Sequence, residues 1–356
     1  MTDKRKDGPE AGPLATSKRQ RGPAATSVAV VNTSVAQGPL IQAIQRSSDL
    51  QAPIIQLSGH TGEVYACRFD NTGEIIASGS LDRTILLWNT YGANENFGVI
   101  KGHKGAVLDL AFSRDSRTLY SASSDATLGV WDADSGVRIR KHVGHEDIVN
   151  SIDRVRRGPE LLLSGSDDGS IALWDPRTKH AVEYMETDFP VLAVAFGEGG
   201  NQLFSAGIDE DIKVWDLRQR NVVYTLPGHA DAVTSLNVSE DMQFLVSRSM
   251  DNSVRTWDIR PFAPESRSLN IYDGAPTSDV EKNLLRASFS PDGSKIIAGS
   301  ADRTVVIWDT LTRKVLYKLP GHTGSVNDAR FSPREFNVIL TGSTDRTLML
   351  GELGKG

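Results

Sequence analysis

The stretch GSADRTVVIWDT at residues 299–310 decides the fold, because near-copies of it recur along most of the chain. Seven copies are recognisable, and six of them carry a Trp at the same position. Successive Trp positions, the last of which is Gly351, lie 41 to 51 residues apart, so we expect one structural unit repeated seven times. The other copies are GSLDRTILLWNT (79–90), ASSDATLGVWDA (122–133), GSDDGSIALWDP (165–176), AGIDEDIKVWDL (206–217), RSMDNSVRTWDI (248–259) and GSTDRTLMLGEL (342–353).

The hairpin in each copy explains why the unit is repeated. In the quoted copy an Asp lies between the small-residue strand IIAGS (296–300) and the β-branched strand TVVIW (304–308), which favours a tight turn. Such a hairpin is apolar on both faces and needs a neighbour on each side, and a closed ring of blades supplies both without long exposed edges. We therefore predict an all-β fold, a seven-bladed β-propeller over residues 53–356. The turn Asp recurs six residues before every Trp position, as Asp82, Asp125, Asp168, Asp209, Asp251, Asp302 and Asp345.

The two ends of the repeat region are predicted to pair with each other. The segment IIQL (54–57) predicts a strand with none before it, and the last copy ends at TLMLGEL (347–353) without a strand after it. Pairing the two would remove the last free sheet edges. We therefore expect a propeller closed by an N-terminal strand.

Residues 1–52 are predicted to form a disordered basic tail. They are rich in Gly, Pro, Ala, Ser, Thr and Gln, contain no aromatic residue and carry seven basic against four acidic side chains. Such a segment cannot bury enough apolar area to offset the entropy lost on ordering. Two basic clusters resemble a bipartite nuclear-import signal, with a solvated polar tail as the open alternative. The clusters are Lys4, Arg5, Lys6, Lys18, Arg19 and Arg21.

The composition excludes several classes of protein. The single Cys, Cys67, excludes an intramolecular disulfide framework and a multi-Cys metal site, which suits a reducing compartment. No secretory signal and no run of about 18 apolar residues is present, so we expect a soluble protein with no membrane contact. Of the net charge of −6, −9 falls on residues 53–356, which argues against non-specific nucleic-acid binding by the propeller. We predict no cofactor, no metal and no small-molecule substrate.

A second pattern links the start of each repeat to its hairpin. The dipeptide Gly-His begins five repeats, and four of these also hold a Ser, the turn Asp and the Trp. His, Ser and Asp are the components of a nucleophilic triad, but four equivalent copies indicate a structural role in which the imidazole links Asp to Ser and to the Trp N–H. We therefore predict no catalytic residue. The predicted structural sets are His60, Ser78, Asp82 and Trp88; His103, Ser121, Asp125 and Trp131; His145, Ser164, Asp168 and Trp174; and His229, Ser247, Asp251 and Trp257.

Three repeats lack part of this set. The fourth has no Gly-His, the sixth has no His and carries Ala298 at the Ser position, and the seventh has Thr341 but no Trp. We expect these blades to be held less firmly or to use other partners in compensation.

The aligned Asp positions together with the Gly-His and Trp-Asp pairs resemble the WD-repeat family over residues of about 53–353. This resemblance implies a rigid, non-catalytic disc whose loops and central opening hold proteins, peptides or nucleic acid. Four segments, together with a long Pro-containing stretch at 260–283, look like the spliceosomal members of that family in the U5 small nuclear ribonucleoprotein. The segments are IDEDIKVWDLRQ (208–219), MDNSVRTWDIRPFAP (250–264), EKNLLRASFSPDGSKIIAGSADR (281–303) and VLYKLPGH (315–322).

The spliceosomal resemblance implies a nuclear scaffold subunit in pre-mRNA splicing. It implies docking on the large U5 core protein and contact with other spliceosomal proteins. Contact with RNA is expected to be peripheral or indirect, because the sequence shows no aromatic-plus-basic motif of the kind that binds single strands.

The family resemblance also implies where partners bind. Residues beside the turn Asp, and those at the start of the inner strand, often line one end of the central opening in such propellers. Leu81, Ile208 and Met250 are apolar where a solvated turn favours polar side chains, so we take them as the preferred anchors, with packing against a neighbouring blade as the alternative. The predicted partner-binding residues are Glu63, Tyr65, Leu81, Arg83, Leu192, Ile208, Glu210, Met250, Asn252, Arg303 and Arg346.

Two other functions are also considered. The tetrapeptides WDPR (174–177), WDLR (215–218) and WDIR (257–260) resemble the Trp-Asp-x-Arg box of substrate receptors of cullin–RING ubiquitin ligases. The structural alternative is that each Arg pairs with acidic groups on the next blade. The second alternative is an enzyme, and it rests only on the Ser-His-Asp sets. It would require one set to react with an active-site serine probe while the equivalent sets do not.

Overall fold

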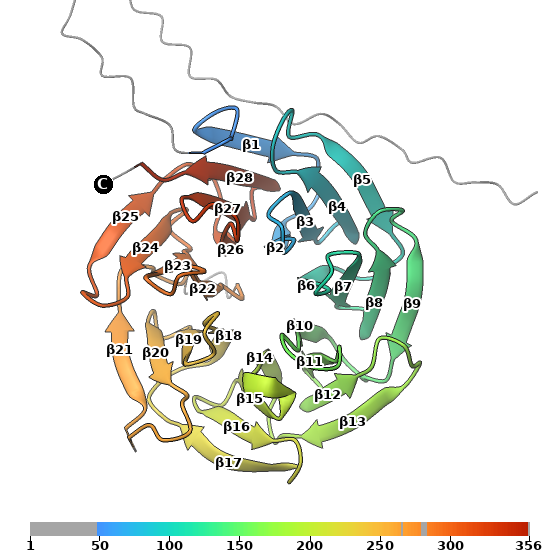
Figure 1. The fold of residues 1–356 in the computed structure, drawn as a ribbon, viewed down its shortest axis with the longest axis vertical. Helices are drawn as coiled ribbons and strands as arrows, with labels where there is room; N and C mark the ends of the chain where they lie inside the picture. The colour runs from blue at the N-terminus through green and yellow to red at the C-terminus, as the bar shows by residue number, and fades with distance from the viewer. Residues whose placement is uncertain (1–47, 265, 279–282, 355–356) are drawn as a thin grey trace, which may run out of the picture.

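The computed structural model describes residues 48–264, 266–278 and 283–354. These residues form seven antiparallel sheets of four strands each, arranged as blades around a central channel (Figure 1). The prediction of a seven-bladed, all-β propeller is therefore confirmed. The predicted tail and its two basic clusters lie outside the described residues.

Each blade runs outward from an inner strand at the channel to an outer strand at the rim. A single 3-10 turn (Glu198–Gly200) accompanies the strands in the described part of the chain. Blade 1 contains β2 (Val64–Phe69), β3 (Ile75–Ser80), β4 (Thr84–Asn89) and β5 (Asn96–Lys101); blade 2 contains β6 (Val107–Phe112), β7 (Thr118–Ser123), β8 (Thr127–Asp132) and β9 (Arg138–Val143); blade 3 contains β10 (Val149–Arg154), β11 (Leu162–Ser166), β12 (Ser170–Trp174) and β13 (Ala181–Glu186); blade 4 contains β14 (Val191–Phe196), β15 (Gln202–Gly207), β16 (Ile212–Asp216) and β17 (Asn221–Leu226); blade 5 contains β18 (Val233–Val238), β19 (Phe244–Ser249), β20 (Val254–Asp258) and β21 (Ser268–Tyr272); blade 6 contains β22 (Ala287–Phe289), β23 (Lys295–Gly299), β24 (Val305–Asp309) and β25 (Val315–Leu319); blade 7 contains β26 (Val326–Phe331), β27 (Val338–Ser343), β28 (Thr347–Glu352) and β1 (Ile54–Ser58).

The ring is closed by the first strand of the chain. β1 pairs antiparallel with β28, with Ile55 opposite Leu350 and Leu57 opposite Leu348. The N–H of Glu352 also donates to the carbonyl of Pro53 at 2.8 Å. The predicted closure by the IIQL segment is therefore confirmed, and β1 covers the edge that β28 would otherwise expose.

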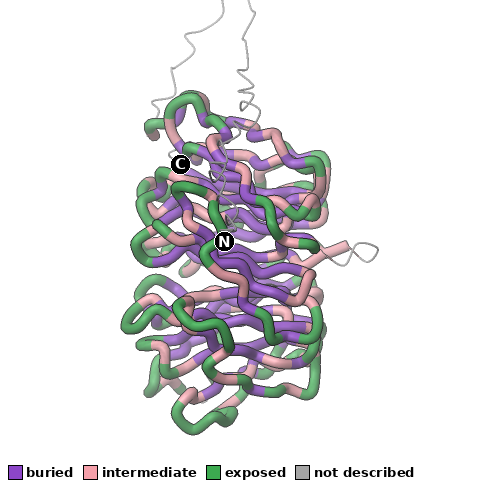
Figure 2. Tube along the Cα trace, turned by 90° about the vertical axis from the view of Figure 1, so that its right-hand side faces the viewer, coloured by how far each residue is buried: buried purple, intermediate pink, exposed green. Residues whose placement is uncertain are grey.

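The hydrophobic core lies between the blades. Seven clusters of buried apolar side chains are found, and each cluster takes its members from two neighbouring blades. Successive side chains of a strand point to opposite sides of its sheet, so a hairpin that is apolar on both faces supplies two of these clusters. Figure 2 shows the buried residues in the strands and the exposed ones at the loops of the two faces.

The turn after the second strand of most blades depends on a left-handed residue that follows the Asp. Arg83, Asn252, Arg303 and Arg346 have φ between 68° and 70°, and Gly169 has φ 79°. These turns lie on one face of the disc together with the loops that enter the inner strands, and we call it the Asp face. The opposite face carries the loops that join the first and second strands of each blade.

The long stretch at 260–283 is not a single insertion. It contains β21, the outer strand of blade 5, so its extra residues divide between two loops. No helix long and apolar enough to cross a membrane occurs in the part of the chain that the structure describes.

Candidate functional site

The Gly-His loops are fastened to the hairpins by a chain of side-chain hydrogen bonds. In blade 1, Trp88 Nε1–H donates to Ser78 Oγ at 3.0 Å, Ser78 Oγ lies 2.8 Å from His60 Nε2, and His60 Nδ1 lies 2.9 Å from Asp82 Oδ2. The same chain joins the four predicted residues in blades 2, 3 and 5, with distances of 2.7 to 3.1 Å. The structure therefore brings together each of the four sets that the sequence singled out.

The Asp carboxylate at the end of each hydrogen-bond network accepts several further hydrogen bonds. Asp82 also accepts the N–H groups of Thr61 and Thr84 at 2.9 Å and the Thr84 hydroxyl at 2.6 Å. Burial alone would raise the pKa of Asp82, but the hydrogen bonds from His60 and Thr84 outweigh burial and hold the pKa well below its usual range. With an ionised carboxylate on Nδ1, the imidazole donates from Nδ1 and accepts the Ser hydroxyl at Nε2.

Of the three incomplete blades, blade 6 uses another group in place of a missing one, and blade 4 keeps part of the set. In blade 6, where Ala298 has no hydroxyl, Trp308 Nε1–H donates to the carbonyl of Asp273 at 2.9 Å. In blade 4, Trp215 still donates to Ser205 at 2.8 Å, but without a His.

Blade 7 keeps the loop end of the chain and lacks its Trp. His322 joins Asp345 at 2.9 Å to Thr341 at 2.8 Å, while Gly351 takes the Trp position. The sequence did not point to the carbonyl of Asp273 in blade 6, because a backbone acceptor has no residue type of its own.

The Ser-His-Asp sets are poorly placed for nucleophilic catalysis. Ser78, Ser121, Ser164 and Ser247 are each 0% exposed, and their hydroxyl oxygens are occupied by an indole N–H and an imidazole. A nucleophile has to reach its substrate, so this burial favours the structural role. No group of three or more His, Cys, Asp or Glu side chains that could hold a metal ion occurs among the described residues.

The predicted partner-binding residues lie at the Asp-face ends of blades 1, 4, 5, 6 and 7, in the Asp turns or near the start of the inner strands. Leu81 is 46% exposed and Ile208 53% exposed, whereas Met250 is half-buried. The exposed residues on the same turns are Arg83, Glu210, Asn252, Arg303 and Arg346, and the half-buried ones near the inner strands are Glu63, Tyr65 and Leu192.

Some of these side chains already have partners within the chain. Asn252 Oδ1 accepts the N–H of Thr277 at 2.6 Å and its hydroxyl at 2.7 Å. The hydroxyl of Tyr65 donates to Glu63 Oε2 at 3.1 Å, and burial together with the Glu63 carboxylate raises the pKa of Tyr65 to about 12. Leu81 and Ile208 remain the most exposed apolar anchors of the predicted set.

Phe189 is a further exposed apolar residue on the Asp face, and the sequence analysis missed it. It is 48% exposed and lies in the loop before β14, where the sequence TDFP (187–190) contains no Gly-His. The N–H of Ile208 donates to the carbonyl of Pro190 at 3.3 Å, so the two exposed apolar side chains lie on adjoining loops. The available signal was the loss of Gly-His, with Glu186-Thr187 at its position, followed two residues further on by the apolar pair Phe189-Pro190.

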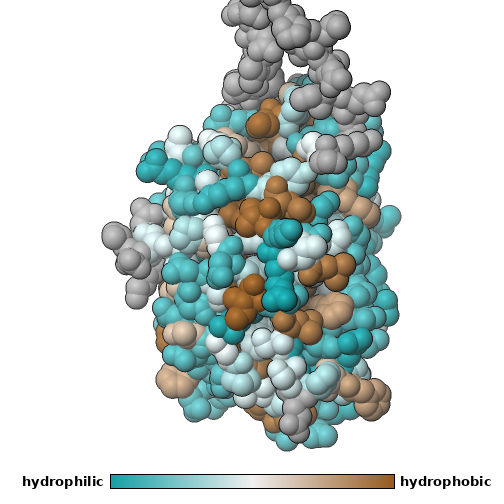
Figure 3. Space-filling view, turned by 90° about the vertical axis from the view of Figure 1, so that its left-hand side faces the viewer, coloured by the Kyte–Doolittle hydropathy of each residue, from teal (hydrophilic) through white to brown (hydrophobic). Residues whose placement is uncertain are grey.

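A second group of apolar side chains lies on the rim. Figure 3 shows them on the side of the disc where the outer strands β21 and β25 lie. Leu269 and Ile271 on β21, and Val315 and Leu316 on β25, are 42 to 49% exposed, and Leu311 is 88% exposed. Apolar surface available to a partner is therefore not confined to the Asp face.

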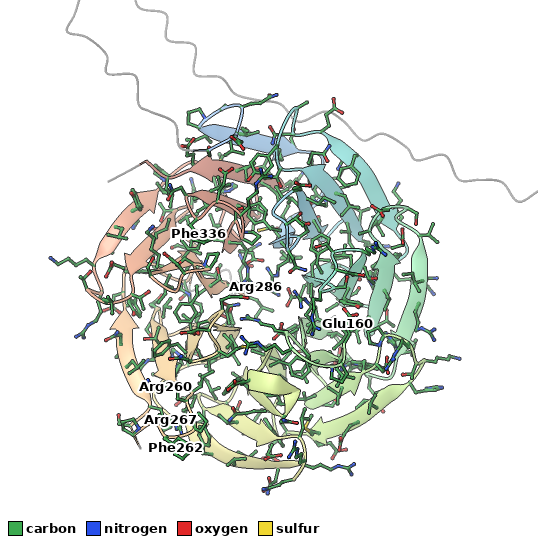
Figure 4. All side chains as sticks on the ribbon, in the orientation of Figure 1. Glu160, Arg260, Phe262, Arg267, Arg286 and Phe336 are labelled. Atoms are coloured by element: carbon green, nitrogen blue, oxygen red, sulfur yellow. The ribbon has the colours of Figure 1, made fainter. Side chains whose placement is uncertain are left out.

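The central channel is spanned by one arginine. Arg286, which precedes β22 in blade 6, donates to Asp109 in blade 2 and to the carbonyls of Leu108 and Asn150 at 2.9 and 3.4 Å. Blades 2 and 3 lie across the ring from blade 6, and Figure 4 places Arg286 in the central opening. Arg286 thus ties distant blades together inside the channel.

Arg286 belongs to a cluster in which three arginines share two aspartates. Arg68 donates to Asp109 at 2.7 Å and to Asp328, and Arg330 Nε donates to Asp328 at 3.0 Å. Burial would raise the pKa of Asp328, but Arg330 and Arg68 lower it to about 2. Burial and the neighbouring Arg68 lower the pKa of Arg330 to about 10. The cluster therefore holds one positive charge in excess.

Two of the three arginines of the Trp-Asp-x-Arg tetrapeptides pair with the Asp of their own motif. Arg177 contacts Asp175 at 2.7 Å, and Arg260 contacts Asp258 at 2.5 Å. The expectation of pairing with the next blade is wrong for these two, because the Asp two residues earlier is closer and already faces the guanidinium.

Comparison with known proteins agrees with this architecture. The family model for the WD domain, G-beta repeat, matches residues 51–89, 94–132, 136–175, 182–216, 220–258, 269–309 and 313–350. The chain therefore belongs to the WD40 repeat family.

Within this family the chain is similar to proteins with spliceosomal names. It is 50% identical over 297 residues to the U5 small nuclear ribonucleoprotein 40 kDa protein of Mus musculus, covering 83% of this chain and 82% of that protein. It is 46% identical over 295 residues to the pre-mRNA-splicing factor cwf17 of Schizosaccharomyces pombe, covering 83% and 86%. The Dictyostelium discoideum U5 40 kDa protein is 46% identical over 298 residues, covering 83% of each chain.

Proposed function

We propose that this chain is a non-catalytic scaffold subunit of the U5 small nuclear ribonucleoprotein, acts in the nucleus during pre-mRNA splicing and docks on the large U5 core protein. The observation that carries the proposal is the identity of 46 to 50% over 83% of the chain to U5 40 kDa proteins and to cwf17. The aligned stretches are 295 to 298 residues long, so the likeness extends far beyond a single repeat.

The architecture supports a binding role over a catalytic one. A closed ring with its core between the blades presents its loops in fixed positions, so a partner loses little additional entropy when it docks. The buried Ser hydroxyls are hydrogen-bonded to Trp and His side chains and are not accessible to a substrate.

We assign the docking of the large U5 protein to the Asp face. Leu81 and Ile208 expose apolar side chains there, and Phe189 adds a third beside Ile208. Apolar and aromatic side chains at the centre of an interface are the usual source of its binding energy. RNA contact is expected to be peripheral.

The test is affinity purification of the tagged full chain from nuclear extract, followed by mass spectrometry and RNA detection. The wild-type chain should recover U5 proteins and U5 RNA. The double substitution Leu81→Asp with Ile208→Asp should abolish this recovery without unfolding the chain. The control is Leu311→Asp, which also places a carboxylate at an exposed Leu but in the loop between β24 and β25, away from the Asp face, and it should leave recovery intact.

The two possible failures are distinguishable. Stoichiometric recovery of a cullin–RING adaptor without splicing proteins would refute the spliceosomal role. Loss of U5 proteins in the Leu311 control but not in the double variant would leave the role and refute the assigned face.

A further inference from the structure

The channel opens on the opposite face into a cavity. Neither the Trp–Ser–His–Asp hydrogen-bond networks nor the predicted docking residues take part in it. Its volume is about 750 Å³, which is within the range of ligand-binding pockets. Its floor is the arginine cluster that includes Arg286, and its mouth is formed by loops between first and second strands, with Asn71, Pro333 and Phe336 among them. Figure 4 shows Phe336 on an inner loop of blade 7.

The walls of this cavity are unusually basic for an acidic molecule. Six arginines and four carboxylates line it, although residues 53–356 together carry −9. The lining charges are Arg68, Arg114, Arg154, Arg156, Arg286 and Arg330, with Asp70, Asp109, Asp153 and Glu240. With Asp328, which pairs with Arg68 and Arg330 beneath the floor, counted as well, this opening still carries one positive charge in excess.

Two arginines at the mouth are not paired with a carboxylate within the described part of the chain. Arg154 donates to Asn71 Oδ1 at 2.8 Å, and Arg114 donates to the carbonyl of Gly158 at 3.2 Å. Burial lowers the pKa of Arg154 although the nearby Asp153 and Glu160 carboxylates act in the opposite direction, because the charge is less well solvated there than in water. An incoming anion would restore that solvation and add charge-assisted hydrogen bonds.

The remaining wall groups suit a peptide better than a nucleic acid. Asp153 is half-buried beside Arg154 and accepts the N–H of Phe196 at 2.8 Å, while Glu240 is exposed near Arg156. A nucleic acid carries a phosphate at every nucleotide, and these carboxylates would repel its phosphates. A peptide alternates side-chain carboxylates with N–H donors and apolar groups, and Phe336, 45% exposed at the rim, offers apolar contact.

We propose that this cavity is a binding site for an acidic polypeptide segment of a partner, which enters from the opposite face and ends against Arg286. Because Arg286 spans the channel, the segment occupies the cavity from one side and does not thread through the disc. Its Asp or Glu side chains contact Arg114 and Arg154, and an apolar residue packs on Phe336. This inference goes beyond the proposed function, because it concerns a second surface on the face away from the assigned docking residues.

The experiment uses the full chain and two probes. A random peptide library displayed on phage is selected on the immobilised protein, and the winning peptide is labelled and titrated by fluorescence anisotropy beside a labelled oligouridine. We expect the selected peptides to be rich in Asp and Glu. The double substitution Arg114→Gln with Arg154→Gln should weaken binding of the winning peptide by about tenfold or more. Arg154→Lys, which keeps the charge, should restore part of the affinity.

The control removes the same charge from the other face. Lys101→Gln with Lys104→Gln alters two exposed lysines where β5 leads into β6, on the Asp face, and should change the affinity by less than about twofold. Selected peptides without an acidic excess, or acidic peptides that bind the Arg114/Arg154 variant as well as the wild type, would overturn the proposal. So would oligouridine binding that depends on Arg114 and Arg154 while peptide binding does not.

Discussion

Removing one turn aspartate should cost far more where it holds a histidine than where it does not. Asp82 in blade 1 accepts hydrogen bonds from His60, from two backbone N–H groups and from the Thr84 hydroxyl. The His60 side chain is 0% exposed, so Asp82→Ala leaves a buried N–H without its acceptor. That loss costs about 1–3 kcal/mol, and the turn donors, which water reaches, add about 1 kcal/mol in total. We expect the free energy of unfolding to fall by about 2–4 kcal/mol.

Asp302 in blade 6 supplies the matched comparison. It occupies the same turn position, but its partners are Thr304 and Lys318, and the Lys318 side chain is 49% exposed. An exposed ion pair contributes about 0–1 kcal/mol, so Asp302→Ala should cost about 1 kcal/mol.

The assay is urea unfolding followed by tryptophan fluorescence, together with the thermal midpoint. The Asp82 variant should melt about 4–8 °C below the wild type, and the Asp302 variant within about 2 °C of it. Asp82→Asn, which keeps an acceptor oxygen, should lie between the two. Equal losses of unfolding free energy for Asp82→Ala and Asp302→Ala would show that the Asp contributes through its turn alone and not through the hydrogen bond to His60. That result would refute a stabilising role for the Trp–Ser–His–Asp networks.

Three further outcomes follow from the packing and the charges. The pKa of Asp328 is about 2 in the folded protein against 3.8 for the free side chain, so its stabilising effect is complete above about pH 4 and lost as the pH falls toward 2; urea midpoints measured across that window should decline, and a flat profile would contradict the cluster. Burial raises the pKa of Cys67, so an aromatic disulfide reagent should label it only after unfolding, and rapid labelling of the native protein would show that β2 is accessible. Leu57→Ala, at a 0% exposed position of β1, should lower the free energy of unfolding by about 2–4 kcal/mol, whereas Ile54→Ala, at a 59% exposed position of the same strand, should change it by less than about 0.5 kcal/mol; similar losses would mean that β1 is not part of the core.

Much of the fold was predictable because its signals are local and repeated. The Asp between a small-residue strand and a β-branched strand specifies a turn within a dozen residues, and seven copies make the signal unmistakable. Closure by β1 followed from counting strands at the two ends of the repeat region. The sets of His, Ser, Asp and Trp were also recognisable, because their members recur at nearly constant spacing in four blades.

The channel was not predictable in the same way. Arg286 and Asp109 are separated by 177 positions, and Arg68 and Asp328 by 260, so no spacing rule connects them. Charged residues within the apolar inner strands VYACRF (64–69) and VNDARF (326–331) were the available signal, but the sequence does not say which pairs with which. Only the closed ring brings the inner strands of distant blades together.

The pairing of β1 with β28 also sets an order of events during synthesis. The strand that completes blade 7 leaves the ribosome first, and its partner is made almost 300 residues later. At about 5–20 residues per second, β1 waits roughly 15–60 s for β28. Throughout that interval the nascent chain carries an unmatched strand at one end and an unfinished blade at the other. A chain released early therefore never shuts its ring, and its two open edges distinguish it from a finished molecule for the chaperones and proteases that survey new proteins.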